Sequence, residues 1–269
     1  MREQLEYTVV SSLFAIAKRT PKKIVYGLFS LLAGMLYIID SRRRNLTKDN
    51  LRKAGLSPKF AWPIYQNFAK TTAEILFLFH DRFDFSSIEG SLTPKTEKPK
   101  IFVTAHFGNW EALAHFLAQS GYPMAVVARE GNNKLIERSF SKPFRQKYGN
   151  KLIYKHGAVR ALFKELKSGN NIGLMIDQKA GSDGIETTFF GRPCKTVPTI
   201  ALLAKKFDVE VVPVFLVREG DKLKLIQKEF SCDGCGIEEY TQRLNDILEE
   251  VVREYPEQWF WMHNRWKMG

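Results

Sequence analysis

The sequence predicts an α/β protein with a mixed, mostly parallel sheet flanked by helices and an N-terminal, membrane-associated helical segment. Beyond residue 100, short apolar runs alternate with stretches of helical periodicity, which is typical of βα units. Before residue 45, a long uncharged run is bracketed by basic residues, which is typical of a segment at a membrane surface. The 269 residues suffice for one large α/β domain or two small ones.

The composition excludes several classes of protein. Hydrophobic residues make up 44% and charged residues 26%, close to globular averages, so a disordered, collagen-like or polytopic membrane protein is excluded. Three cysteines are too few for a disulfide scaffold and favour a reducing compartment. The formal net charge is +12, and the first 60 residues carry +8 of it. Because the excess lies at one end, it favours a local explanation over general nucleic-acid binding.

That local explanation begins with residues 24–39, which carry no charge and lie between Lys22-Lys23 and the basic run 42–44. As a helix they would span roughly 24 Å at about 1.5 Å per residue, slightly less than a bilayer core of about 30 Å. We therefore expect residues 1–45 to anchor the chain to a membrane. A buried core helix is the alternative, and both a single span and a monotopic hairpin agree with the pattern.

A second apolar stretch, residues 8–17, precedes this run, and Pro21 is expected to break the helix between the two. A cleavable signal peptide is disfavoured, because the main apolar run is too long and too far from the start.

The rest of the chain, residues 46–269, is predicted as the second unit. Residues 46–80 have helical periodicity, and the polar stretch 91–100 is expected to be a linker or surface loop. Strands are expected at 101–105, 124–128, near 151–154, and at 171–176, 209–217 and 222–228, the last two forming a hairpin. Helices are expected at about 109–119, 159–168, 198–206 and 237–254, and a further helical region is expected between the strand at 124–128 and about residue 148. A loop is expected over 181–193.

Polar residues follow three of these strands directly. His106 ends the first strand, Arg129 the second and Asp177 the strand at 171–176. In open α/β sheets, working side chains collect beyond the C-terminal ends of the strands, so these three are candidate site residues.

The sharpest motif is AHFGNWE, residues 105–111. If His106 lies in the turn before a helix and Glu111 in its first turns, the two side chains can converge. The Glu111 carboxylate would then accept a hydrogen bond from one imidazole nitrogen and leave the other free as a general base. Such a base could take the proton of a substrate hydroxyl, whose oxygen could attack a thioester.

This motif resembles the His-x4-Asp/Glu motif of glycerolipid acyltransferases, members of the lysophospholipid acyltransferase superfamily. Its Glu ending resembles the bacterial lipid A biosynthesis late acyltransferase family, the lauroyl and myristoyl transferases of lipopolysaccharide assembly. The family's pattern continues, in order, in VVARE, FRQKYGN, MIDQ, FFGRPCKTVPTIALLAKK and YPEQWFWMHNRWK. The N-terminal apolar helix also fits, so the resemblance covers nearly the whole chain and implies a glycerolipid acyltransferase-like fold with 46–269 as its catalytic domain.

The resemblance implies roles for individual residues. His106 would be the general base and Glu111 its orienting partner. Arg145 in FRQKYGN and Asp177 in MIDQ match the family's basic and acidic positions near the reacting groups, with Arg129 as a second basic candidate. Two further basic residues near the 198–206 helix could bind phosphate, and they are Arg192 and Lys195.

The resemblance also implies substrates and a location. The acyl donor would be a thioester, acyl carrier protein or coenzyme A, and the acceptor a lipid A precursor, often carrying Kdo sugars. The enzyme would act on the cytoplasmic face of a bacterial inner membrane. Acyl carrier protein is acidic, which suits a basic surface, and no metal or bound cofactor is expected. The alternatives are acylation of another glycolipid or a lysophospholipid, and an inactive lipid-binding homologue.

Two weaker patterns point elsewhere. Cys232 and Cys235 have CxxC spacing, but a single pair cannot fill a four-ligand zinc site, so they are interpreted as incidental. The aromatic cluster at 259–266 could stack on bases, but a membrane-interface or packing role fits the apolar N-terminus better, and no nucleic-acid partner is expected.

Overall fold

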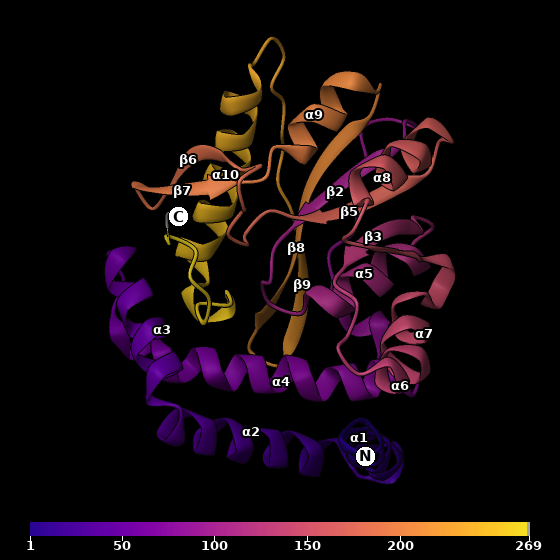
Figure 1. Cartoon of the computed structure of the whole chain (residues 1–269), viewed down its shortest axis with the longest axis vertical. Coiled ribbons are helices and arrows are strands. Elements are labelled where there is room, and N and C mark those ends of the chain that lie inside the picture. Colours follow the sequence, from indigo (N-terminus) through magenta and orange to yellow (C-terminus); the bar gives the residue numbers. More distant parts are fainter. Residues whose placement is uncertain (268–269) are drawn as a thin grey trace.

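The computed structural model describes residues 1–267 and confirms the predicted α/β class. A seven-stranded sheet in the order β1-β9-β8-β2-β5-β3-β4 crosses the molecule, with helices on both faces (Figure 1). Its strands are β1 (Ile88–Glu89), β2 (Lys100–Thr104), β3 (Met124–Ala128), β4 (Lys151–Tyr154), β5 (Asn171–Met175), β8 (Glu210–Glu219) and β9 (Lys222–Gln227). A separate antiparallel hairpin consists of β6 (Ile185–Phe189) and β7 (Arg192–Thr196).

Strand β2 is the centre of the sheet and runs parallel to both of its neighbours. Ile101 lies opposite Ile172 of β5 and Val211 of β8. The predicted hairpin of β8 and β9 is antiparallel, and the other strand pairs described in this sheet are parallel. The carboxyl ends of β2, β5 and β3 therefore lie side by side at one edge.

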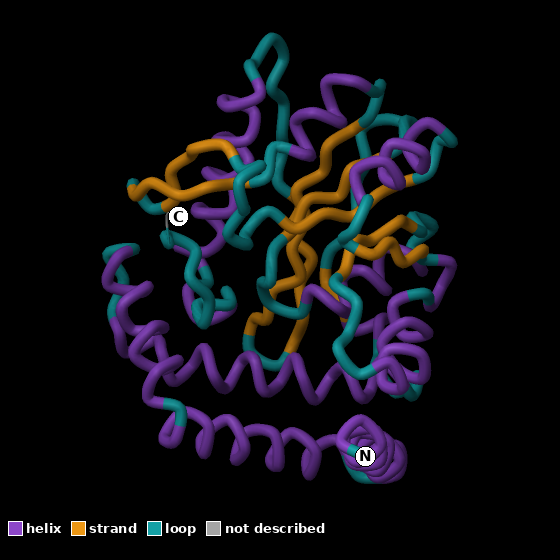
Figure 2. The backbone as a smooth tube through the Cα atoms, viewed as in Figure 1, coloured by secondary structure: helices purple, strands orange, loops and turns teal. Residues whose placement is uncertain are grey.

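Helices surround this sheet (Figure 2). They are α1 (Arg2–Arg19), α2 (Lys22–Ile39), α3 (Ser41–Lys53), α4 (Ala61–Phe79), α5 (Trp110–Gln119), α6 (Lys134–Ile136), α7 (Lys142–Arg145), α8 (Ala158–Lys167), α9 (Thr199–Lys206) and α10 (Ile237–Glu254). The break predicted at Pro21 is confirmed. The region 46–80 is divided, because Gly55, at φ 72°, turns the chain after α3 and Pro58 opens a short 3-10 turn before α4. The boundary placed after residue 45 falls within α3.

Two further features differ from the sequence prediction. The segment 181–193 was predicted as a loop, but residues from 185 onward form strand β6 and the start of strand β7. Thr187 and Thr196 are buried on this hairpin, and their hydroxyls form hydrogen bonds with each other and with Asn245 of α10. Because these buried side chains are polar, the sequence of the hairpin lacks the apolar run that predicts a strand. Cys232 and Cys235, interpreted as incidental, are joined in a disulfide.

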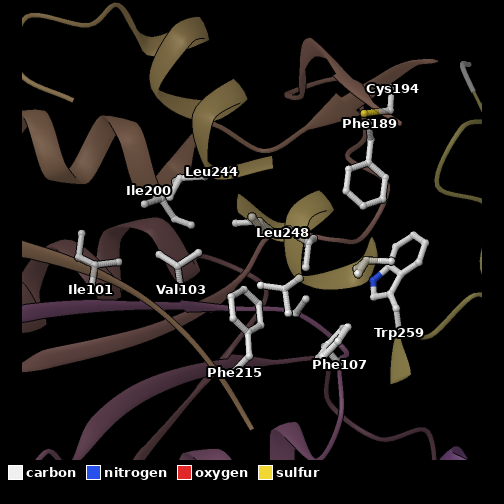
Figure 3. Close-up of a cluster of buried hydrophobic side chains, with 14 of the residues drawn as sticks. Ile101, Val103, Phe107, Phe189, Cys194, Ile200, Phe215, Leu244, Leu248 and Trp259 are labelled. Atoms are coloured by element: carbon white, nitrogen blue, oxygen red, sulfur yellow. The ribbon is translucent and has the colours of Figure 1, made fainter. Parts of the chain in front are cut away.

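The two faces of the sheet pack into separate apolar clusters. One contains Ile101 and Val103 of β2 together with Ile200 of α9 and Leu248 of α10, and Figure 3 shows these side chains converging. The other contains Leu113 and further residues of α5, the end of α4 and β8. The central strand is therefore buried on both sides, as expected for a parallel sheet, and its carboxyl end is held rigidly.

Candidate functional site

His106 and Asp177 meet at the carboxyl edge of the sheet. They follow the adjacent parallel strands β2 and β5, whose matching register brings their ends together. The Asp177 carboxylate lies 3.0 Å from the imidazole Nδ1 and accepts a second hydrogen bond, also 3.0 Å, from the backbone N–H of His106. Asp177 is fully buried, whereas the His106 side chain is 23% exposed. An imidazole that donates its Nδ1–H to a carboxylate carries its lone pair on Nε2.

The hydrogen bond predicted between His106 and Glu111 is not formed, and this corrects the sequence interpretation. Nδ1 faces the end of the neighbouring strand, where it donates to Asp177. Glu111 lies in the first turn of α5, and its side chain forms no hydrogen bond or ion pair within residues 1–267. It acts on the imidazole through its negative charge alone.

The two groups shift each other's pKa in opposite directions. Burial by itself lowers the pKa of His106, but the charge and hydrogen bond of Asp177, with a smaller contribution from Glu111, outweigh burial and raise it above the ordinary value. Burial by itself raises the pKa of Asp177, but the charge and hydrogen bonds of His106 and the nearby His263 hold it well below the usual range. Asp177 is therefore a permanent carboxylate that orients His106 and makes it more basic.

The turn that carries His106 is fixed by Gly108 and Asn109. Gly108 has φ 55°, and a Cβ there would lie 2.0 Å from the carbonyl oxygen of Leu216 in β8, so only glycine fits. Asn109 is buried, and its side-chain oxygen caps α5 by accepting the N–H of Ala112 at 2.9 Å. The motif AHFGNWE thus ends a strand, turns tightly and starts a helix.

A buried ion pair, which the sequence prediction missed, supports this turn from α4. Glu74 accepts two hydrogen bonds from Arg218 of β8, at 2.9 and 2.8 Å, and one from the Asn109 amide at 2.6 Å. Both side chains of the pair are largely buried. A carboxylate within the apolar run of α4 was the available signal, since a buried charge requires a partner.

Removing Glu74 is expected to destabilise the fold more than removing an exposed carboxylate. Glu74→Ala would leave the largely buried Arg218 without a charged partner, so we expect the free energy of unfolding to fall by about 3–5 kcal/mol. The matched control is Glu239→Ala on α10, whose 2.7 Å pair with Arg243 is exposed, with an expected loss of about 0.5 kcal/mol. Urea unfolding of both variants measures the difference, and equal losses would contradict the role given to Glu74.

The C-terminal segment packs against the His106–Asp177 pair and holds it through hydrogen bonds. Trp259 donates its indole N–H to Asp177 at 3.1 Å, and the backbone N–H of Phe260 donates to the carbonyl of His106 at 3.0 Å. The guanidinium of Arg265, fully buried, donates to the carbonyls of Gln178 and Lys195 at 3.1 and 2.8 Å. The terminal aromatic and basic residues therefore hold the catalytic candidates in place, a role that sequence reasoning did not assign to them individually.

A narrow aromatic slot, with room for about one water molecule, lies beside the imidazole. Its walls are Phe68 of α4, Trp110 of α5 and Phe260, and the rings of Trp110 and Phe260 lie 5.4 and 6.3 Å from that of His106. The Gln178 amide donates a long hydrogen bond to Nε2 at 3.4 Å. The Nε2 atom of His106, which carries the lone pair, thus has one polar and several apolar neighbours.

The predicted basic residues are not brought together with His106. Arg129 follows β3, two strands from β2, and bonds to Asn132 at 3.3 Å. Arg145 ends α7, where its charge acts on Tyr154 at the end of the outermost strand β4.

The two residues expected near the start of α9 lie in β7 instead. The Arg192 guanidinium donates to the carbonyl of Lys53 at 2.7 Å, which ties the hairpin to α3. Lys195 is half-buried, and its carbonyl accepts from Arg265. Among residues 1–267, no three His, Cys, Asp or Glu side chains come close enough to hold a metal ion.

The family model for the bacterial lipid A biosynthesis acyltransferase matches residues 84–268, more than half of the chain. No curated protein matches. The matched range contains His106, Glu111, Asp177 and the C-terminal segment.

Proposed function

From the premise that the chain belongs to the bacterial lipid A biosynthesis acyltransferase family, we propose that it transfers a fatty acyl chain from a thioester to a hydroxyl of a lipid A precursor. The family supports acyl transfer and a lipid A substrate, and suggests a membrane-associated enzyme. The observation that carries the mechanism is the His106–Asp177 pair, which leaves the imidazole lone pair on Nε2, beside the Gln178 amide and the aromatic slot.

In the proposed reaction, Nε2 of His106 takes the proton of the acceptor hydroxyl. The oxygen attacks the thioester carbonyl carbon, and the tetrahedral intermediate expels the sulfur, which receives the proton from Nε2. The products are an ester and a free thiol, and no outside reductant or oxidant is required. Asp177 stabilises the imidazolium formed in the first step, and the negative charge of Glu111 adds to this stabilisation.

The remaining parts of the proposal concern the substrates. The rings of Phe68, Trp110 and Phe260 offer the acyl chain an apolar surface next to the base. The donor is acyl carrier protein, whose acidic surface complements a chain with a net charge of +12. Exposed Arg129 and partly exposed Arg145, beyond the strand ends, are available for acceptor phosphates. The site of action is the cytoplasmic face of the bacterial inner membrane.

The test is an acceptor competition with purified protein. Acyl carrier protein loaded with a fatty acid is offered a phosphorylated, Kdo-bearing lipid A precursor, a second glycolipid and lysophosphatidic acid, and products are identified by mass spectrometry. We expect one acyl mass added to the lipid A precursor alone. Acylation of lysophosphatidic acid alone would overturn the acceptor assignment, and no acylation of any acceptor would favour an inactive lipid-binding homologue.

A further inference from the structure

Helices α1 and α2 present a row of large apolar side chains to solvent. This apolar outer face consists of Leu5, Leu13, Leu28, Leu31, Met35 and Ile38, each of which is exposed. Leu31 is 63% exposed. Many large apolar side chains exposed along two successive helices of a folded protein indicate a docking site.

The opposite face of α2 is attached along α4. Near one end of α2, the Tyr26 hydroxyl donates to Glu74 at 3.1 Å, and near the other, the Tyr37 ring packs 5.1 Å from that of Tyr65. Between them, Gln66 donates to the carbonyl of Ser30 at 3.3 Å. Figure 1 shows the two helices running side by side. The direction of α2 is therefore fixed by α4.

This attachment limits the orientations that α2 can take in a bilayer. Among residues 1–267, α2 is the one helix long and apolar enough to cross a membrane, with a mean hydropathy of 1.5. However, α4 packs on the sheet through Ile64 and Leu78. A crossing α2 would thus pull α4, with the exposed Lys70 and the edge of the sheet, into hydrocarbon, which strongly disfavours charged groups.

Helix α1 is held to the same body at both ends. Arg82 donates to the carbonyls of Lys18 and Thr20, at 3.1 and 2.9 Å, and Asn133 donates to the carbonyl of Glu3 at 2.8 Å. Both helices are therefore fixed to the same folded body.

Basic residues lie at both ends of α2. Lys22 and Lys23 are exposed at its start, and Arg42 and Arg43 are exposed just beyond its end. In an in-plane orientation, all four would reach the headgroups of one leaflet, where anionic lipids attract them.

We propose that α1 and α2 lie flat in one leaflet of an anionic bilayer, with both ends of α2 on the same side of the membrane. This inference rests on the proposed function, which requires access to a membrane lipid. Phe68 of α4 is 38% exposed and also lines the aromatic slot beside His106. The helix that supports α2 thus also forms one wall of the candidate site.

The orientation is tested by cysteine labelling of the full chain in bacterial membranes. Lys23→Cys and Arg42→Cys, at exposed positions on either side of α2, are treated with a membrane-impermeant maleimide in inverted vesicles and in intact spheroplasts, with the unmodified chain as background. We expect both positions to be labelled in the same preparation and protected in the other. Labelling of one position in each preparation would show a span and overturn the proposal.

The partner is tested by flotation with vesicles of phosphatidylethanolamine and phosphatidylglycerol. Leu31→Glu combined with Met35→Glu is expected to reduce the floated fraction at least tenfold, because charged side chains do not enter the acyl region. The control is Leu202→Glu on α9, since Leu202 is 51% exposed away from this face, and we expect it to float normally. Unchanged flotation of the double variant, or a dimer in solution that the double variant dissociates, would overturn the proposal.

Neither readout depends on acyl transfer, so the two proposals fail separately. A chain that floats and exposes both ends of α2 on one side, but acylates no acceptor, contradicts the proposed function only. A chain that acylates a lipid A precursor in detergent micelles, but fails both membrane tests, contradicts the in-plane inference only.

Discussion

His106→Ala is expected to lower kcat for acyl transfer by about 10³-fold, because it removes the group that accepts the hydroxyl proton. KM for the thioester donor should change little, since the base acts in the reaction step and not in donor binding. The measurement is the initial rate with saturating acyl carrier protein and a lipid A precursor, accompanied by circular dichroism to confirm the fold.

The substitution also leaves the buried Asp177 without its imidazole partner, so a second variant separates catalysis from folding. His106→Asn keeps an N–H donor on the side of Asp177 and removes the Nε2 base, and we expect it to fold normally and to be as inactive as the alanine variant. His156→Ala, at an exposed position after β4, is the matched control with full activity. Near-normal turnover in His106→Asn would rule out general-base catalysis by this residue.

Several strands and helices were predictable because apolar runs, helical periodicity and proline are signals that lie within the elements themselves. The strands at 124–128 and 151–154 and the helix at 237–254 have the predicted limits, and the break at Pro21 is confirmed. The β6–β7 hairpin was not predicted, because its buried residues include threonines. A pattern based on apolar residues does not identify a polar core held by hydrogen bonds to Asn245.

The residues of the site were predictable from their positions after strands, but their pairing was not. His106 and Asp177 were both identified because each follows an apolar strand, but their pairing depends on which strands are neighbours. The order β2-β5-β3 places Asp177 beside His106, although β3 follows β2 in the sequence. Spacing along the chain therefore favoured Glu111, five residues away, over Asp177, which lies 71 residues away.

Asp177→Asn is expected to lower kcat by about 10²-fold or more, and to move the pH dependence of the reaction. An amide has no charge to stabilise the imidazolium, and it can present an N–H to Nδ1 and so favour the wrong tautomer. In the wild type, the raised pKa of His106 predicts a rate that rises with pH through a midpoint above that of a free histidine, about 6.5. Without the Asp177 charge, burial dominates, and the midpoint should shift to lower pH.

Glu111→Gln distinguishes this assignment from the one that the sequence favoured. Because Glu111 contributes charge without a hydrogen bond, we expect a loss of about tenfold or less and a smaller shift of the midpoint in the same direction. Full pH–rate profiles of both variants, with their thermal unfolding temperatures, give the comparison. If Glu111→Gln abolished the reaction while a folded Asp177→Asn enzyme kept its rate and its pH midpoint, Glu111 and not Asp177 would be the group that orients the base.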